Sequence, residues 1–217
     1  EQALALDPAN PDVLGSAALL ARRLGRIDEA IELGEYQMAR DPLNASGHDT
    51  LAYSYRYAGR LDAALAERRA ALSLSPRLIG GHWGIGEELL QMGDLGMALA
   101  EFEQEPDEAS RLIGLSMAYH ALGKGTESDA ALAELIAKHE IWPCNIAYVL
   151  AFRGEADQAF EWMERAVERR DPLVGAIPVH PMFANLHKDP RWLPFLRKHG
   201  MAPEQLAAIR FDVTVPK

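Results

Sequence analysis

Three kinds of residue recur in this sequence at an interval of 34 positions, and this interval limits the fold more than any other feature. They are Gly25, Gly59 and Gly93; Ala30, Ala64 and Ala98; and Pro8, Pro42 and Pro76. A period of this length, marked by a turn glycine and a closing proline, is typical of a helical repeat in which each unit supplies two antiparallel helices. The sequence therefore predicts an all-α array. Such arrays more often bind partners along a curved surface than carry out reactions, so we expect a binding function.

The first complete unit shows how local residues define a helix pair. We expect one helix over residues 12–24, a turn at Gly25, where a positive φ favours glycine, and a second helix over residues 28–40. Pro42 then ends the unit, because proline disrupts a helix interior. Counted in this way, the units lie near residues 11–44, 45–78, 79–108, 109–139 and 140–171.

The period contracts after the third turn glycine. Gly123 follows Gly93 by 30 residues and Gly154 follows Gly123 by 31, so we expect the second helix of the third unit to be about one turn short. In the fourth unit, Ser128 stands where earlier units have the alanine at which the two helices cross. We therefore expect the curvature of the array to change after residue 105.

Both ends of the sequence depart from complete repeats. Residues 1–10 match the second helix of a preceding, truncated unit, because their apolar residues and proline recur 68 positions later. We therefore expect an upstream part of the protein, with any localisation signal, to precede Glu1. Residues 171–217 are expected to form a C-terminal helical cap and tail that covers the apolar face of the last unit. The apolar side chains available for this are Phe183, Leu186, Trp192, Phe195 and Leu196.

The helix motifs carry a family resemblance. In the third unit they are Ile85-Gly86-x-x-Leu89 and Ala98-x-x-x-Phe102. These fragments are close to L-G-x-x-Y and A-x-x-x-F, and residues 11–170 therefore resemble the tetratricopeptide repeat (TPR). The resemblance implies a right-handed α-solenoid superhelix of about five repeats with a C-terminal cap. The stretches GEADQAFEWMERAVERRDP and PMFANLHKDPRWLPFLRKHG also resemble the C-terminal TPR region of bacterial multidomain regulators, where the array follows a winged-helix, nucleotide-cyclase or kinase domain.

The resemblance also implies which residues meet a partner, because the first helix of each TPR unit lines the concave face. Residues on these helices that point away from the Leu, Ala and Tyr side chains packed between helices are expected to face solvent, in the groove along the concave face. Arginine and aromatic side chains, which are enriched in binding hot spots, are prominent among them. The candidate partner-binding residues are Arg22, Arg23, Asp49, Tyr53, Arg56, Tyr57, Trp83, Glu87, Gln91, His120, Tyr148 and Phe152.

Alternatives stay open for several of these residues. Tyr53, Trp83 and Tyr148 either contact a partner or pack between helices. The three arginines either meet an acidic or phosphorylated segment or are solvated surface charges. Some TPR domains grip the C-terminal carboxylate of chaperones with Lys, Asn and Arg residues, and these are missing here, so we expect no chaperone adaptor function. The matching positions are Gly15, Leu19, Thr50, Gly80 and Gly84.

Composition argues against several classes of partner. The sequence has 22 Lys and Arg residues against 32 Asp and Glu, a net charge of −10 at pH 7, so we expect no nucleic-acid binding by this segment. No run approaches the roughly 18 apolar residues of a membrane span, so we expect no membrane partner. The single cysteine, Cys144, cannot form an internal disulfide. It favours a reducing, cytoplasmic location and is expected to be a buried structural thiol.

No motif for chemistry stands out. Seven histidines are present, none in an H-E-x-x-H or C-x-x-C context, and we expect His48 and His82, at equivalent repeat positions, to pack between helices. The glycine-rich run 80–86 lacks the preceding strand and the Gly-Lys-Ser or Gly-Lys-Thr ending of a phosphate loop. We expect a helix there that is locally weak, or closely approached by another backbone. We expect no catalytic residue, no cofactor and no metal.

These observations favour a non-enzymatic protein–protein interaction module that binds a peptide or protein segment in its concave groove. The alternative is a regulatory, sensing or oligomerisation domain that acts on an N-terminal domain of a larger signalling protein. An acidic partner segment and association into a homo-oligomer are both left open.

Overall fold

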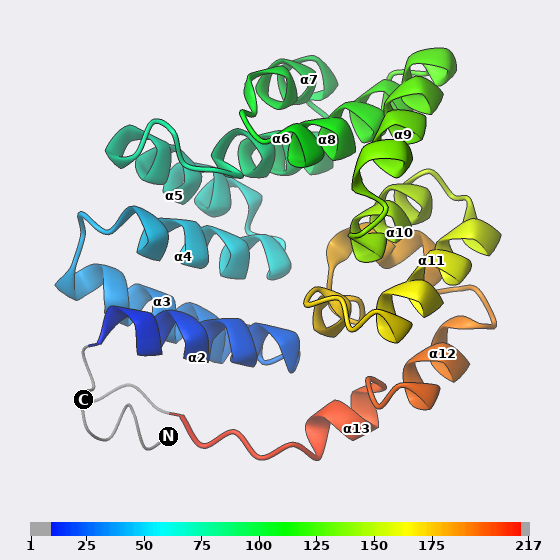
Figure 1. The fold of residues 1–217 in the computed structure, drawn as a ribbon. Coiled ribbons are helices and arrows are strands. Elements are labelled where there is room, and N and C mark those ends of the chain that lie inside the picture. Colours follow the sequence, from blue (N-terminus) through cyan, green and yellow to red (C-terminus); the bar gives the residue numbers. More distant parts are fainter. Residues whose placement is uncertain (1–9, 214–217) are drawn as a thin grey trace.

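The computed structural model describes residues 10–213, which form an array of antiparallel helix pairs (Figure 1). The pairs are α2 (Pro11–Arg23) with α3 (Ile27–Arg40), α4 (Ala45–Tyr57) with α5 (Leu61–Leu74), α6 (Gly81–Met92) with α7 (Leu95–Gln104), α8 (Glu108–Ala121) with α9 (Gly125–His139), and α10 (Pro143–Phe152) with α11 (Ala156–Glu168). The short 3-10 helices η1 (Val174–Ala176) and η2 (Pro181–Leu186) follow, and then α12 (Trp192–Lys198) and α13 (Pro203–Ala207). The helix expected over residues 1–10 lies outside the described residues, apart from Asn10.

Local side chains define where the helices begin and end. Asn10 caps α2, because its side-chain oxygen accepts hydrogen bonds from backbone N–H groups of the first turn at 3.1 and 3.2 Å. Asn44 caps α4 in the same way, with a hydrogen bond of 2.9 Å. Gly25 and Gly59, with φ of 75° and 73°, make the left-handed turns that end α2 and α4. The predicted turn glycines are thus confirmed at these two positions.

Helix α6 begins differently, at a buried carboxylate that directly follows the short helix α7. The buried carboxylate of Glu105 accepts hydrogen bonds from the backbone N–H groups of Gly80 (3.1 Å) and Trp83 (2.9 Å) at the start of α6. A negative charge is favourable at this end of a helix. Helix α7 ends just before Glu105 and has 10 residues, where α3 and α5 each have 14. The predicted loss of about one turn is confirmed.

Small buried residues lie where paired helices cross. Ala30, Ala64 and Ala98 have no exposed surface, and neither has Ser128, which takes the equivalent place in the fourth pair. The Ser128 hydroxyl donates to the carbonyl oxygen of Ser116 at 2.8 Å, and the Ser116 hydroxyl donates to the carbonyl oxygen of Ser128 at 3.1 Å. Serine is therefore accommodated at this crossing because its buried hydroxyl has a partner.

Glycines of α6 make room for side chains of the neighbouring helices. A Cβ atom at Gly84 would lie 2.3 Å from Nε of Arg68, and one at Gly86 would lie 2.4 Å from the ring of Phe102. Residues 80–86 are therefore closely approached, as expected, but by side chains. The expectation of a neighbouring backbone is wrong, because α5 and α7 pack against α6 through these two large residues.

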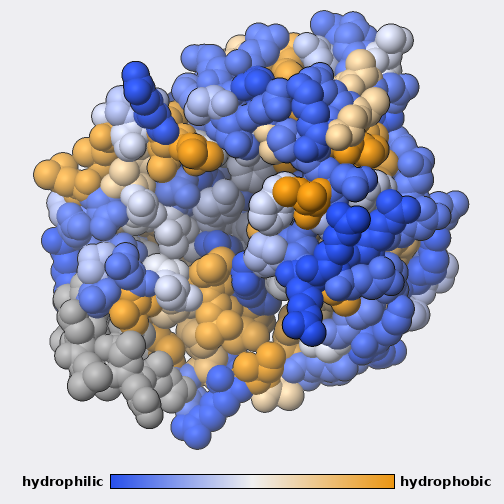
Figure 2. Space-filling model, in the orientation of Figure 1, coloured by the Kyte–Doolittle hydropathy of each residue, from blue (hydrophilic) through white to orange (hydrophobic). Residues whose placement is uncertain are grey.

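The C-terminal segment, residues 171–213, returns to the first helix pair instead of extending the array. In Figure 1 the orange and red segment passes from α11 back beneath α2. Arg26, between α2 and α3, donates hydrogen bonds to the carbonyl oxygens of Ile209 (2.8 Å) and Phe211 (3.2 Å). Figure 2 shows hydrophobic side chains, in orange, between α2 and this segment. The described chain therefore forms a closed ring, in which the C-terminal segment joins the two ends of the array.

The apolar side chains expected to cover the last unit are buried in the largest core of the protein, which includes α10 and α11. They are Phe183, Leu186, Trp192, Phe195 and Leu196. Every helix within residues 10–213 is too short or too polar to cross a bilayer.

Candidate binding cavity and groove

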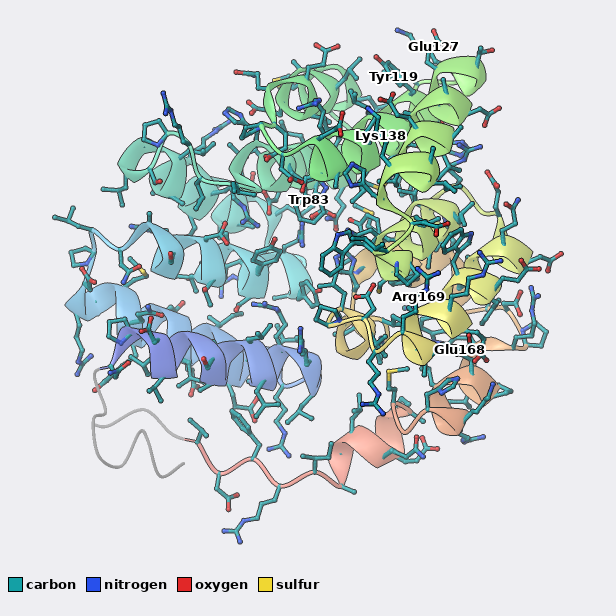
Figure 3. The ribbon with its side chains drawn as sticks, viewed as in Figure 1. Trp83, Tyr119, Glu127, Lys138, Glu168 and Arg169 are labelled. Atoms are coloured by element: carbon teal, nitrogen blue, oxygen red, sulfur yellow. The ribbon has the colours of Figure 1, made fainter. Side chains whose placement is uncertain are left out.

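The first helices of the pairs and the C-terminal segment enclose a cavity of about 170 Å³. Helices α2, α4, α6, α8 and α10 form one side, and residues 173–183 form the other. Trp83, labelled in Figure 3, lies on the inner side of the ring. The cavity is lined by Leu19, Arg22, Arg23, Tyr53, Tyr57, Trp83, Ile113, Cys144, Asn145, Tyr148, Leu173, Ala176, Val179, His180 and Phe183.

Arg22, near the end of α2, places a buried positive charge against aromatic rings. Arg22 is 8% exposed, and its guanidinium carbon lies 5.0 Å from the ring centre of Tyr53 and 5.4 Å from that of Tyr57. The pKa of Arg22 is lowered, mainly by burial, but the guanidinium stays protonated at neutral pH. Its hydrogen bond to the carbonyl oxygen of Thr50 is long, at 3.5 Å.

Arg23 ties the array to the C-terminal segment. Its Nη2 donates a hydrogen bond of 2.9 Å to the carbonyl oxygen of Pro172. Within residues 10–213, neither Arg22 nor Arg23 forms an ion pair with a carboxylate. Two guanidinium groups thus line the cavity without a neutralising partner.

Two buried groups of charges join α4, α5 and α6 beside the cavity. Arg56 pairs with Glu87, and Arg68 pairs with Asp49 and, at 3.4 Å, with Glu88. The side chains of both arginines and both glutamates are fully buried. Burial raises the pKa of Glu88, and the nearby arginines oppose this rise. Because a buried charge that loses its partner is strongly destabilising, these groups depend on one another.

His180 projects from the C-terminal segment between two rings of the array. Its ring centre lies 4.6 Å from that of Tyr148 and 5.4 Å from that of Tyr57, both edge-to-face. Burial is the main cause that lowers the pKa of His180 well below its usual value, and the positive charges of Arg56 and Arg22 add to this effect. The imidazole is therefore neutral at pH 7.

Three residues that line the cavity each carry a buried donor with no acceptor among the described residues. These donors are the Tyr148 hydroxyl, Nε1 of Trp83 and Nε of Arg23. A buried donor without a partner costs about 1–3 kcal/mol. Such groups call for a partner, which a ligand or an ordered water supplies.

An open groove of about 370 Å³ lies between α2 and α4. Gln37, from α3, contributes a side chain that is largely buried and whose Oε1 has no partner among residues 10–213. Leu19, Arg22 and Tyr53 line both the groove and the cavity, so these side chains stand between the two. The groove is lined by Pro11, Asp12, Gly15, Ser16, Leu19, Arg22, Gln37, Asn44, Ser46, Asp49, Thr50 and Tyr53.

Half of the candidate residues from the sequence come together at the cavity: Arg22, Arg23, Tyr53, Tyr57, Trp83 and Tyr148. Asp49 lines the groove, and Gln91 donates a hydrogen bond of 3.4 Å to the carbonyl oxygen of Glu87. His120 and Phe152 contact each other, with ring centres 6.1 Å apart, and line neither the cavity nor the groove. The role of all these residues as partner contacts stays a prediction.

The expectation that these side chains face solvent is wrong for four of them. Arg22, Arg56, Glu87 and Tyr148 are buried, with exposed fractions of 8, 1, 0 and 6%. Two physical causes account for this. The C-terminal segment covers the inner side of the array, and Arg56 and Glu87 lie against each other away from water. Burial, and then the charge of Glu88, raise the pKa of Glu87 well above its usual value, and a carboxyl group is less costly to bury when protonated.

Sequence reasoning missed the C-terminal side of the cavity. His180 and Phe183 lie in the predicted cap, where Pro178 and Pro181 signal turns, but no local pattern indicates that these turns face α4 and α10. Gln37 was missed as well, because it belongs to a second helix and only first helices were expected to line the groove.

The histidines and the cysteine have structural environments. Nδ1 of His48 lies 2.5 Å from a carboxylate oxygen of Glu67, and Nδ1 of His82 lies 2.8 Å from one of Glu101. Each contact joins the two helices of one pair. The two histidines therefore lie between paired helices, as expected, and also make a polar contact there.

Cys144 is buried as expected, and burial raises the pKa of its thiol. Residues 10–213 contain no cluster of three His, Cys, Asp or Glu side chains arranged to hold a metal ion.

The fold of this chain is similar to that of several solved TPR proteins. A thermophilic TPR protein from Thermus thermophilus has a TM-score of 0.62 and 19% identity, with 80% of this chain and 98% of that chain covered. PilW, a type IV pilus biogenesis factor, has a TM-score of 0.56 and 17% identity, covering 91% and 96%. YrrB, described as a TPR protein with an unusual peptide-binding site, has a TM-score of 0.51 and 14% identity, covering 86% and 95%.

No protein-family model and no curated protein matches this sequence. The structural likenesses are nevertheless extensive along the chain and share one architecture. The predicted fold, an α-solenoid of TPR type, is therefore confirmed.

Proposed function

We propose that this chain is a protein-interaction module that binds an extended segment of a partner protein in the groove between α2 and α4. The TPR fold supports a protein–protein interaction scaffold in general. YrrB, which shares this fold, is described as having a peptide-binding site, and this supports a peptide-like partner. The proposal assigns binding, and no reaction, to this chain.

The observation that carries the proposal is the amide of Gln37 in the groove. Gln37 is 4% exposed, and its Oε1 has no hydrogen-bond partner among the described residues. A Cβ atom at Gly47 would lie 3.2 Å from Nε2 of Gln37, so this glycine leaves room for the amide. When the Gln37 side chain turns toward the groove, a backbone N–H of an extended segment supplies the donor that Oε1 lacks. Because every peptide has such groups, this contact gives affinity without a sequence requirement.

Side-chain preference would come from the other residues that line the groove. Leu19 and Tyr53 offer apolar surface, whereas Asp12 and Arg22 offer charges of opposite sign. An acidic residue of the partner is expected near Arg22, because this guanidinium forms no ion pair within residues 10–213. Charge-reversed versions of a bound peptide test this finer part of the proposal.

The experiment selects binding peptides from a displayed random library and measures their affinity for variants of the protein. Gln37→Met keeps the length of the side chain and removes its amide, so we expect affinity about tenfold weaker, as for loss of one hydrogen bond to a buried group. Gln104→Met is the matched control, because Gln104 is an exposed residue of α7 that lines neither the groove nor the cavity. Equal affinity of both variants for every selected peptide would exclude this groove.

The regulatory alternative uses the same fold and stays a prediction, as does the likeness to bacterial multidomain regulators. Self-association also belongs to the proposal, because a second copy of the chain supplies peptide segments. Light scattering across a range of protein concentrations measures it. A mass that stays at that of one chain would exclude a homo-oligomer.

A further inference from the structure

The cavity differs from the groove in its chemistry. Of the residues that line it, none is Asp or Glu, while Arg22 and Arg23 bring two positive charges. The carboxylate of Glu87 is paired with Arg56, so it is not free to neutralise them. His180 is unprotonated near neutral pH, since burial and the nearby arginines lower its pKa. The cavity therefore carries a net positive charge and suits an anion.

Three residues of the cavity lining each carry a polar hydrogen that has no acceptor within residues 10–213. The Tyr148 hydroxyl belongs to a residue that is 94% buried, since only 6% of it is exposed, and Nε1 of Trp83 and Nε of Arg23 are also unpartnered within residues 10–213. Burying donors without acceptors is unfavourable. Donors of this kind around one cavity favour a ligand that brings acceptor oxygens, as a carboxylate does, over a ligand that brings further donors.

Size and wall chemistry define the rest of the ligand. The cavity volume of about 170 Å³ is close to that of an engineered apolar cavity, about 150 Å³, that holds benzene. Tyr57, Trp83, Tyr148 and Phe183 supply aromatic wall, and the Tyr148 and Trp83 ring centres lie 6.4 Å apart. An aromatic ring fits such walls by edge-to-face or offset contacts.

We propose that the cavity binds a small aromatic monocarboxylate, whose carboxylate pairs with Arg22 and Arg23 and whose ring packs among Tyr57, Trp83 and Tyr148. The ligand would contact α2, α4, α6 and α10 together with the C-terminal segment, so it would stabilise the closed ring. The cavity shares Arg22 with the groove, but Gln37 lines only the groove and Tyr148 lines only the cavity, so variants of these two residues test the two proposals separately. Either proposal can therefore fail without the other.

Benzoate, its neutral analogue benzamide and the ring-free anion acetate are the probes. Each is titrated at millimolar concentrations into the protein, with isothermal titration calorimetry and thermal unfolding as readouts. Benzoate is expected to bind and to raise the melting temperature. Benzamide and acetate are each expected to bind at least about tenfold more weakly, because one lacks the charge and the other lacks the ring.

Matched variants locate the site. Tyr148→Phe removes one hydroxyl and keeps the ring, and Arg23→Gln removes one charge; each is expected to weaken benzoate binding about tenfold. Tyr119→Phe is the control, because Tyr119, labelled in Figure 3, lies outside the cavity lining. Circular dichroism verifies that each variant folds. No benzoate binding at millimolar concentration, or equal binding by wild type, Tyr148→Phe and Arg23→Gln, would overturn the proposal.

Discussion

Arg26 and Phe211 are 185 residues apart in sequence and are joined by a hydrogen bond of 3.2 Å, from Nη1 of Arg26 to the carbonyl oxygen of Phe211. Phe211 also belongs to the same buried hydrophobic cluster as Leu14 and Ala18 of the first helix pair. These contacts turn an open solenoid into a ring. In a repeat array each unit contacts only its neighbours, so a long-range contact of this kind couples the stability of the first and last parts.

Replacing Phe211 is expected to weaken this closure. The residue is 8% exposed, and removing a buried aromatic side chain costs about 3–5 kcal/mol. Since Phe211 lies near the described C-terminus, where the chain can adjust, we expect Phe211→Ala to lower the free energy of unfolding by about 2–3 kcal/mol. Urea denaturation followed by circular dichroism measures it. Ile209→Ala, at a 44% exposed residue, is the control, and an equal effect of both changes would contradict closure through Phe211.

Two helical glycines are expected to respond in opposite ways to alanine. A Cβ atom at Gly114, in α8, would lie 2.1 Å from the ring of Phe102, whereas one at Gly15, in α2, would meet nothing within 4 Å. We expect Gly114→Ala to destabilise the protein by about 1–3 kcal/mol through overpacking. Gly15→Ala should stabilise it by about 0.5–1 kcal/mol, since alanine loses less backbone entropy in a helix. A melting temperature that rises in Gly114→Ala would show that the packing around Gly114 is misassigned, and one that falls in Gly15→Ala would contradict the open space at Gly15.

The repeat pattern predicted the helix pairs but not the ring. Turn glycines such as Gly25 act through local conformation, so their effect can be predicted from neighbouring residues alone. The contact between Arg26 and Phe211 has no local signal, because nothing in either segment specifies the other. The candidate site was predicted only in part for the same reason. Periodicity placed Arg56 and Glu87 on first helices, but their burial depends on each other and on the covering segment.

Arg68 stands where the A-x-x-x-F motif has phenylalanine, and its charge is held by Asp49 and Glu88. Arg68→Met leaves the buried Glu88 without its partner, and we expect a loss of about 3–5 kcal/mol in the free energy of unfolding. Adding Glu88→Leu removes the uncompensated charge, so the double variant should recover most of that loss. Urea denaturation of the single and double variants forms a thermodynamic cycle. Additive effects would show that the two side chains do not interact.

His180 is expected to make stability depend on pH. Its pKa in the folded protein is well below the usual 6.5, because of burial and of the charges on Arg56 and Arg22. Below pH 6.5 the unfolded chain therefore binds a proton that the folded chain does not, so the free energy of unfolding falls as the pH is lowered from 6.5 toward the folded pKa. Burial raises the pKa of Glu88, which acts in the opposite direction, so the measurement is a difference between variants.

The variant His180→Phe keeps a ring between Tyr57 and Tyr148 and cannot be protonated. Wild type should lose roughly 1 kcal/mol more stability than this variant between about pH 7 and pH 5.5, because each unit between the pH and 6.5 corresponds to 1.36 kcal/mol. Urea denaturation at both pH values measures it, with His120→Phe, at an exposed histidine, as the control. If wild type and His180→Phe lost the same stability on acidification, His180 would titrate alike in the folded and unfolded chains. That result would contradict the burial of His180 between the two tyrosines.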